Sequence, residues 1–385
     1  MRIAFHAPMK PLGSSTPSGD GRMAELFAEA LRQGGADVAT ACRLRSYDQG
    51  DPARQARLET LGVRFAGKLI EAYRMKRLPS PDLWFTYHLY HKAPDLVGPL
   101  VTEALGIPYV VAEASFAPKR AGGKWDVGHR AAERAIRAAD RIHCLNPADA
   151  ACLEPLLHSP AVLKDLAPFI DTAPFAASAM ERAAARRETV AAFDFSPNAP
   201  ILLTVAMMRQ DQKLASYRVL ADALERLVAL DWSLLVVGAG PAEAEVRALF
   251  APFGHRIGFA GLRKGRTLAG AYAASDIFVW PAVKEAFGVA FIEAASAGLA
   301  IVAGRSGGIA HIVEDGRTGL VVDAGDAAAT AGALRRLLAD PSEMRGMGEA
   351  GALRAASIND IGAAAQFLAD DLAGVVRRHE AGRGR

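Results

Sequence analysis

The chain is poor in cysteine and in net charge. Three cysteines, Cys42, Cys144 and Cys152, occur among 385 residues and form no C-x-x-C pair, so the sequence predicts neither a disulfide framework nor a zinc site. Its 45 basic and 42 acidic side chains leave a net charge of +3, which excludes the strongly basic surface of a dedicated nucleic-acid-binding protein. These features indicate a protein of the reducing cytoplasm.

The sequence also lacks an apolar run typical of a membrane span or a leader. The most apolar window, 286–304, is interrupted by Glu293 and Gly298, which favours a buried helix followed by a strand. Residues 1–8 contain too short an apolar stretch for a signal peptide and predict a first buried strand. With 51% apolar and 23% charged residues, a chain of this length predicts two folded domains.

Short apolar runs alternate with longer amphipathic stretches throughout, as in parallel sheets covered by helices on both faces. We therefore predict an α/β protein with two doubly wound, Rossmann-like domains in tandem, at 1–168 and 200–360. A proline-bracketed linker, 169–199, would connect them, and 361–385 would form a last helix and a frayed tail. The predicted strands are 3–5, 83–86, 109–112 and 141–145, then 201–205, 233–237, 257–259, 277–280, 301–303 and 319–322.

Two predicted loops carry groups that suit an anionic ligand, and ligands of such sheets bind beyond the carboxyl ends of the strands. Arg209 and Lys213 follow strand 201–205 and can pair with phosphate oxygens. Glu285 follows strand 277–280, and Glu293 lies in the next helix. The amides of Phe287, Gly288 and Val289 begin that helix, where free N–H groups and the helix dipole favour a diphosphate.

A glycine-containing helix start, Gly19-Asp20-Gly21, follows the first strand and predicts a further anion site in the first domain. Glu113, His88, His91 and His129 are candidates for acceptor chemistry in that domain. For each histidine, an ordinary surface or core role is the alternative.

The motifs of the second domain resemble family 4 of the retaining GT-B glycosyltransferases. The resemblance rests on Glu285-Ala-Phe-Gly with Glu293, on Ser306-Gly-Gly-Ile, on Gly238-Ala-Gly-Pro, and on Thr318-Gly-Leu-Val-Val. It covers the whole second domain and, more weakly, the first. It implies the GT-B fold, in which two Rossmann-like domains face each other across a cleft.

The resemblance implies roles for individual residues. Glu293 would bind the ribose hydroxyls of a nucleotide, and Glu285 the hydroxyls of the donor sugar. Arg209 and Lys213 would bind the diphosphate, without a metal ion or a cofactor. The remaining implied donor-binding residues are Phe287, Gly288 and Val289 beside the sugar and phosphates, Gly19 and Gly21 on the β-phosphate, Leu262 near the base, and Gly238.

Two positions depart from the family pattern. Ala206-Met207-Met208-Arg209 replaces the usual Gly-Arg-Leu opening of the phosphate loop. Where the family often has a histidine, strand 109–112 leads instead into Glu113, which becomes the candidate catalytic group on the acceptor side.

The implied reaction is transfer of a sugar, with retention, from a nucleotide diphosphate sugar to a saccharide or glycolipid hydroxyl, in cell-envelope or extracellular polysaccharide assembly. A GT-B nucleotide-sugar epimerase and a catalytically degenerate nucleotide-sugar-binding protein are the alternatives. Residues 54–77 interleave basic and apolar side chains. They indicate either peripheral contact with an anionic membrane at its inner face or a solvated helix surface.

Overall fold

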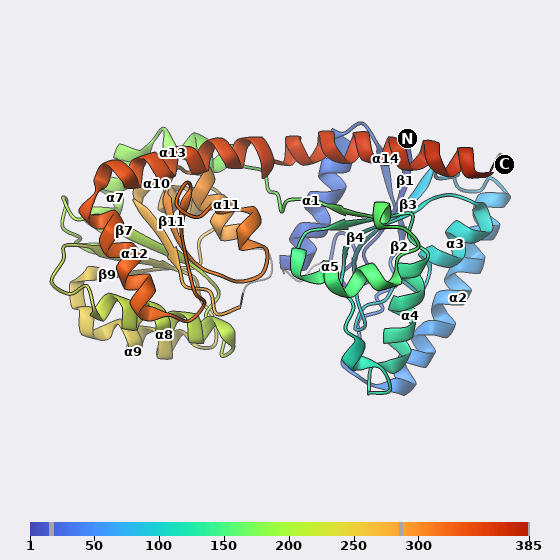
Figure 1. Ribbon diagram of the computed structural model, residues 1–385, viewed down its shortest axis with the longest axis horizontal. Coiled ribbons are helices and arrows are strands. Elements are labelled where there is room, and N and C mark those ends of the chain that lie inside the picture. The colour runs from blue at the N-terminus through green and yellow to red at the C-terminus, as the bar shows by residue number, and fades with distance from the viewer. Residues whose placement is uncertain (15–18, 285–287, 384–385) are drawn as a thin grey trace. The chain divides into compact units, whose positions relative to one another are not determined.

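The computed structural model describes residues 1–14, 19–284 and 288–383, and it divides the chain into two units. Unit 1 comprises Met1–Leu166 and Ile361–Arg385, and unit 2 comprises Ala167–Asp360. Each unit holds one six-stranded sheet with helices on both faces (Figure 1). The predicted α/β class, with two doubly wound sheets, is thereby confirmed.

The sheet of unit 1 has the strand order β2-β1-β3-β4-β5-β6, and neighbouring strands run parallel. Its order reverses between β1 and β3, so the loops that follow these two strands diverge there. The elements of unit 1 are β1 (Arg2–His6), α1 (Gly19–Gln33), β2 (Asp37–Cys42), α2 (Pro52–Arg74), β3 (Leu83–Leu89), α3 (Gly98–Leu105), β4 (Tyr109–Ala114), α4 (Asp126–Arg137), β5 (Arg141–Cys144), α5 (Pro147–Leu153), β6 (Leu163–Asp165) and α14 (Ile361–Arg383).

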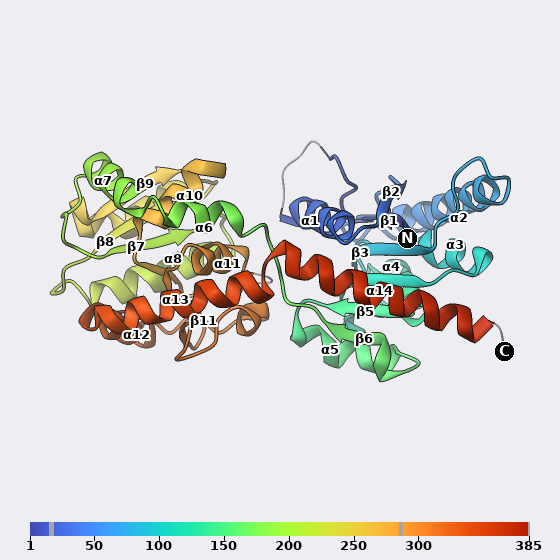
Figure 2. The ribbon, with the colours of Figure 1, turned by 90° about the horizontal axis from the view of Figure 1, so that it is seen from above.

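Helix α14 packs beside α1 on one face of this sheet, whereas α2, α3 and α4 pack together elsewhere in the unit (Figure 2). The contact with α1 is close, because a Cβ atom on Gly34 would lie 2.8 Å from the carbonyl oxygen of Ala365. The helix continues to Arg383, so it includes most of the tail that the sequence predicted to fray.

Helix α2 begins at a well-formed cap, since the Asp51 side chain accepts hydrogen bonds from the amides of Ala53 and Arg54. Gly62 and Ala66 on one side of the helix are buried, whereas Leu61 is 38% and Phe65 is 41% exposed on the other. No helix in the described ranges is long and apolar enough to cross a bilayer.

The sheet of unit 2 has the order β12-β11-β10-β7-β8-β9, again with parallel neighbours. Its switch point lies between β7 and β10. The elements of unit 2 are α6 (Ala173–Ala179), α7 (Arg182–Phe193), β7 (Ile201–Val205), α8 (Gln212–Glu225), β8 (Ser233–Val237), α9 (Glu243–Phe250), β9 (Ile257–Gly261), α10 (Gly265–Ala274), β10 (Ile277–Trp280), α11 (Val289–Ser296), β11 (Ala300–Gly304), β12 (Gly319–Val322), α12 (Ala327–Ala339) and α13 (Pro341–Ile358).

The segment 169–199, which the sequence predicted to link the domains, contains α6 and α7, and both helices pack against α10 within unit 2. Arg182 and Arg186 form ion pairs of 2.6 and 2.7 Å with Asp276. The same carboxylate accepts a 2.7 Å hydrogen bond from the amide of Ile201, the first residue of β7. This segment is therefore a structural part of unit 2.

Candidate functional site

The switch point of unit 2 brings together two loops that the sequence singled out. Strands β7 and β10 are neighbours in the sheet, and the chain leaves them for opposite sides of the switch point. Arg209 and Lys213 follow β7, and Gly288 and Val289 follow β10. Ligands of doubly wound sheets bind at this edge, so the geometry makes it the candidate ligand site of unit 2.

Lys213 lies in the first turn of α8, which starts at the Asp211 cap: the Asp211 side chain accepts a 2.9 Å hydrogen bond from the Lys213 amide. The Lys213 ammonium is 5.4 Å from the ring centroid of Trp280, the last residue of β10, within the range of a cation–π contact. This contact places a cation at the end of β10. Arg209 lies in the preceding loop and is exposed.

Gly238, directly after β8, contacts the loop that follows β7 and the last residue of β9. A Cβ atom at this position would lie 1.9 Å from the Ala206 carbonyl oxygen, and the residue has φ +150°. The same oxygen accepts a 2.9 Å hydrogen bond from the Tyr217 hydroxyl, and the Gly238 amide donates to Gly261 at 2.9 Å. Gly238 is thus required for backbone packing at the site edge. Leu262, the next residue after β9, exposes 56% of its surface.

Glu293 lies in the second turn of α11, where the Tyr272 hydroxyl donates a 2.7 Å hydrogen bond to its Oε2 atom. Burial, followed by the Glu293 charge, raises the pKa of Tyr272 well above its ordinary value, so the hydroxyl stays protonated at neutral pH. The sequence assigned no role to Tyr272. Its sequence signal was its place near the end of α10, as a bulky residue followed by two alanines.

Helix α11 starts at Gly288, which has the left-handed backbone conformation with φ +66°. A Cβ atom there would lie 2.7 Å from the Phe291 ring, so glycine is needed for both conformation and space. The amide of Val289 stands in the first turn of this helix. Glu285 and Phe287, to which the sequence gave roles at this site, lie outside the described residues.

In unit 1, a second group of side chains lies where β1 and β3 diverge. Asp20, in the first turn of α1, is 3.1 Å from Nδ1 of His88 near the end of β3. The other ring nitrogen of His88 is 3.8 Å from Oε1 of Glu113 on β4. The predicted glycines Gly19 and Gly21 flank Asp20. The structure therefore joins the glycine-containing helix start, His88 and Glu113 into one cluster.

The charges of this cluster are coupled. Burial raises the pKa of Glu113 to about 7, and the positive charge of His88 only partly opposes that rise. Burial alone would lower the pKa of His88, but the carboxylates of Glu113 and Asp20 outweigh it and raise the pKa. The hydrogen bond from His88 lowers the pKa of Asp20. At neutral pH, the cluster can therefore exchange a proton at Glu113.

The backbone of this cluster is unusual as well. His88 and Glu113 both have φ +60°, a value that is uncommon for residues other than glycine. Such conformations cost about 1–3 kcal/mol each and cluster at functional sites. Neither the φ angles nor the meeting of Asp20 with His88 could be read from the sequence.

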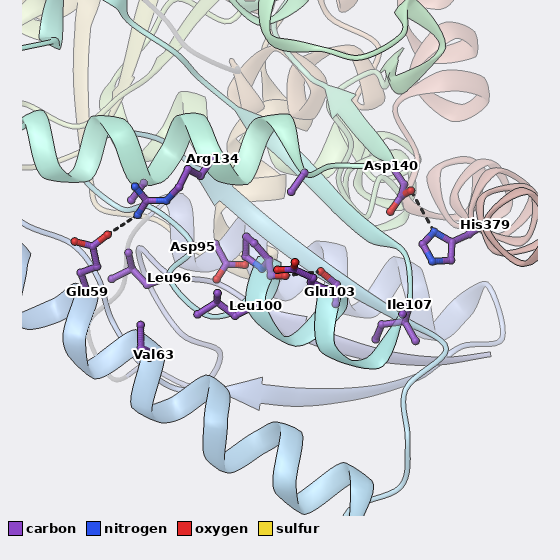
Figure 3. Close-up of a pocket in the computed structure, with 15 residues that line it drawn as sticks. Glu59, Val63, Asp95, Leu96, Leu100, Glu103, Ile107, Arg134, Asp140 and His379 are labelled. Carbon is purple, nitrogen blue, oxygen red and sulfur yellow. Dashed lines mark hydrogen bonds and ion pairs between the residues drawn. The ribbon is translucent and has the colours of Figure 1, made fainter. Parts of the chain in front are cut away.

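A separate groove in unit 1 lies away from these residues. It encloses about 730 Å³ between α2, α3, α4 and the end of α14 (Figure 3). Val63, Leu96 and Leu100 supply apolar wall, and the ion pairs of Glu59 with Arg134 and of Asp140 with His379 lie at its sides. None of the residues that the sequence assigned to donor binding or catalysis lines this groove.

Within 1–14, 19–284 and 288–383, no three His, Cys, Asp or Glu side chains are grouped so that they could hold a metal ion.

The second unit contains a segment with known relatives. Residues 199–340 match the sequence model of the family described as glycosyl transferases group 1. The chain is 31% identical over 157 residues, 40% of its length, to the sulfoquinovosyl transferase SQD2 of Arabidopsis thaliana. It is 35% identical over 131 residues, 31% of its length, to a GDP-mannose-dependent alpha-(1-6)-phosphatidylinositol monomannoside mannosyltransferase of Mycolicibacterium smegmatis. These matches span 29% and 34% of the two relatives.

Over the whole chain, the fold is similar to that of Anabaena HepE solved with UDP: the TM-score is 0.72 at 17% identity, covering 97% of this chain and 100% of that one. The two units therefore form an α/β protein of the GT-B fold class, as the resemblance implied. The match to the glycosyl transferases group 1 model lies within unit 2 and spans 199–340 only.

Proposed function

We propose that the chain is a retaining glycosyltransferase that moves a sugar from a nucleoside diphosphate sugar to an acceptor hydroxyl without a metal ion. The observation that carries the proposal is the switch point of unit 2, where Lys213 lies against Trp280 and Tyr272 fixes one oxygen of Glu293. A cation, a helix start and an oriented carboxylate match the needs of a diphosphate and a ribose.

In the proposed reaction, the bond between the anomeric carbon and the diphosphate oxygen breaks, and the acceptor oxygen forms the new bond. Lys213, Arg209 and the amides that begin α11 offset the negative charge developing on the diphosphate, the role a metal ion would otherwise fill. Glu285 binds the donor sugar and Glu293 the ribose. Unit 1 supplies Glu113, whose pKa of about 7 suits proton exchange with the acceptor hydroxyl.

The names of two relatives support the ligand classes. The Mycolicibacterium smegmatis protein is named as dependent on GDP-mannose and as acting on a phosphatidylinositol monomannoside, and HepE was solved with UDP. We therefore propose a nucleotide sugar as the donor and a saccharide or glycolipid of the cell envelope as the acceptor.

The test is thermal stability in EDTA with UDP, GDP, ADP and their sugar conjugates. A ligand at 100 times its Kd adds about 2.7 kcal/mol to the free energy of unfolding. We expect one nucleotide to stabilise the wild type but not Glu293→Ala. Glu243→Ala, which removes a partly exposed carboxylate of α9, serves as the control. Stabilisation by none of the nucleotides would overturn the proposal.

Product analysis with the stabilising sugar conjugate separates the reaction types. Transfer or slow hydrolysis with retention supports the proposal, whereas accumulation of an epimerised nucleotide sugar would assign the chain to the epimerase alternative. Binding with neither reaction across a broad acceptor set would assign it to the degenerate binding proteins.

We also propose peripheral contact of α2 with the cytoplasmic face of an anionic membrane. Leu61 and Phe65 are exposed next to Arg64 and Lys68, a combination that suits the headgroup region. Co-sedimentation with phosphatidylglycerol vesicles, but not with phosphatidylcholine vesicles, is expected for the wild type and lost in Phe65→Asp. Equal recovery of both proteins would count against the contact.

A further inference from the structure

Three cations of unit 1 surround one indole ring. Lys92 follows β3, whereas Arg120 and Lys124 lie in the loop that follows β4. Their charged groups are 5.0, 4.7 and 4.3 Å from the ring centroid of Trp125. All three therefore meet at the edge of the sheet where its ligands are expected.

This cluster has no matching negative charge. In the part of the chain that the structure describes, none of the three cations has a carboxylate oxygen within 4.0 Å. The nearby acids are engaged elsewhere: Asp126 pairs with Arg130 at 2.8 Å, and Asp48 accepts hydrogen bonds from the amides of Gly50 and Asp51. Like charges held this close repel one another, so a bound anion would stabilise the arrangement.

Polar atoms without partners gather at the same place. Among the described residues, Nε1 of Trp125, Nε of Arg120, Nε2 of His91 and Nδ1 of His129 are buried without a hydrogen-bond partner. His129 is only 4% exposed. Buried polar groups are nearly always hydrogen-bonded, so four orphaned atoms in one cluster indicate that a polar ligand completes it.

His91 fits an anion site through its neutral state. Burial, followed by the charges of Arg120 and Lys92, lowers the pKa of His91 to about 4. At neutral pH, the imidazole therefore adds no charge, and it packs edge-on against Trp125 with the ring centroids 5.5 Å apart. The positive charge of the cluster comes from the two lysines and the arginine.

A continuous series of rings connects this cluster with Glu113. His88 stacks on Tyr90 at 4.9 Å, Tyr90 meets His91 at 5.2 Å, and His91 meets Trp125. His88 in turn faces Glu113. One ligand could therefore place a hydroxyl near Glu113 and a charged group at Trp125.

We propose that Lys92, Arg120 and Lys124 bind an anionic group, a phosphate or a carboxylate, carried by the acceptor. This inference rests on the proposed function and names its acceptor class: an acidic or phosphorylated saccharide whose reacting hydroxyl lies toward Glu113. The four orphaned polar atoms, together with three cations lacking a counter-charge, carry the proposal.

Trp125 offers a direct readout in the full chain. The other tryptophans, Trp84, Trp232 and Trp280, are at most 2% exposed, whereas Trp125 is partly exposed. We expect glucose 6-phosphate to change the tryptophan emission in a saturable manner, and glucose to require at least tenfold higher concentration. The change should disappear in Trp125→Phe. If it persists in that variant, or if the two sugars bind equally, the proposal is overturned.

Two matched variants distinguish a specific anion site from non-specific electrostatic attraction to a basic surface. Lys124→Ala removes an exposed cation beside Trp125 and should weaken glucose 6-phosphate binding about tenfold, which corresponds to about 1.4 kcal/mol. Lys119→Ala removes a neighbouring exposed cation and should leave binding unchanged. Equal losses in both variants would mean that only overall charge matters, and would overturn the proposal.

Two further comparisons identify the source of the anion and test this inference separately from the proposed function. A response to glucose 6-phosphate assigns the site to a charged saccharide, a response only to phosphatidylglycerol vesicles assigns it to a lipid headgroup, and a response to neither overturns the inference. The nucleotide test depends on Glu293 in unit 2. Nucleotide binding without anion binding would therefore remove this inference alone. Anion binding without nucleotide binding would remove the proposed function and, with it, the acceptor role of the anion site.

Discussion

The Tyr272 hydroxyl donates a 2.7 Å hydrogen bond to Oε2 of Glu293, although the two residues lie on different helices, α10 and α11. Because Tyr272 is fully buried and its pKa is raised well above the ordinary value, this donor keeps its proton. One carboxylate oxygen is thereby fixed by the protein. Pre-organisation of this kind lowers the entropic cost of binding a ligand.

Tyr272→Phe should therefore weaken nucleotide binding three- to tenfold, because Glu293 loses the hydrogen bond that fixes one of its oxygens. Loss of one buried hydrogen bond should also lower the free energy of unfolding by about 1 kcal/mol. Isothermal titration with the nucleotide that stabilises the wild type measures the first effect, and denaturant unfolding measures the second.

Ser275→Ala is the matched control for this prediction. Ser275 is buried directly after α10, and its hydroxyl donates a 2.8 Å hydrogen bond to the carbonyl oxygen of Ala271. Its loss should cost similar stability without changing nucleotide affinity. Equal affinities of Tyr272→Phe and the wild type would show that the tyrosine does not position Glu293.

Much of the fold could be predicted because the buried strands have a local signature. Strands such as 201–205, 233–237 and 277–280 are short apolar runs flanked by turn residues, and the structure has them at the same bounds. Strand β2 (Asp37–Cys42) was missed because it is an edge strand in which only Cys42 is buried, so it has no continuous run of large apolar residues. Helix α8 starts at Gln212, because the Asp211 side chain caps it.

From the sequence, only groups that closely follow a strand could be proposed for the site. Lys213, Gly288 and Val289 are recognisable by their place after a strand. Two contacts join residues that are distant in sequence: Tyr272 with Glu293, and Asp20 with His88. No local sequence pattern predicts either contact. Their meeting depends on the order of strands in each sheet, which a single sequence does not encode visibly.

Gly238→Ala should disrupt the edge of the candidate donor site. The added Cβ would overlap the carbonyl oxygen of Ala206, so the loops after β7 and β8 must separate. We expect at least a tenfold loss of nucleotide affinity and a destabilisation of about 1–3 kcal/mol. Gly270→Ala, on α10, has no atom within 4 Å of the new Cβ and should retain wild-type affinity. Unchanged affinity in Gly238→Ala would remove this loop from the site.

Glu113→Gln should reduce the loss of folding stability that occurs as pH rises. The pKa of Glu113 is raised from 4.5 to about 7, so the folded protein holds this proton more tightly than the unfolded chain. The advantage is fully present below pH 4.5 and is lost as pH rises through 7. By linkage, the loss approaches roughly 3 kcal/mol. The charges that act on Glu113 come from His88, Asp20 and Asp149.

Unfolding midpoints measured from pH 4.5 to 8 check this prediction. The stability of Glu113→Gln relative to the wild type should rise across that window. Glu103→Gln, which changes an exposed carboxyl group on α3, should follow the wild type at every pH. A constant difference between Glu113→Gln and the wild type would show that Glu113 does not titrate in this window.

Asp371→Asn should detach α14 from unit 1. The Asp371 carboxylate meets Nε2 of His143 at 2.9 Å, Nε of Arg141 at 2.9 Å and Nζ of Lys164 at 3.1 Å. Burial opposes its charge, but these three partners outweigh burial and lower the pKa of Asp371, so its stabilisation is present at neutral pH and is lost in strong acid.

Removing this charge leaves buried basic groups without a partner, at a cost of about 3–5 kcal/mol. Denaturant unfolding at pH 7 should show this loss, and limited proteolysis should cut α14 faster. Asp370→Asn, at the exposed neighbouring position, should change neither result. Helix α14 belongs to unit 1, although the chain before it, Ala167–Asp360, belongs to unit 2. Faster cleavage of Asp371→Asn without a change in nucleotide binding would show that the contacts of Asp371 anchor this helix without shaping the site of unit 2. Equal cleavage of both variants would mean that apolar packing against α1 holds the helix by itself.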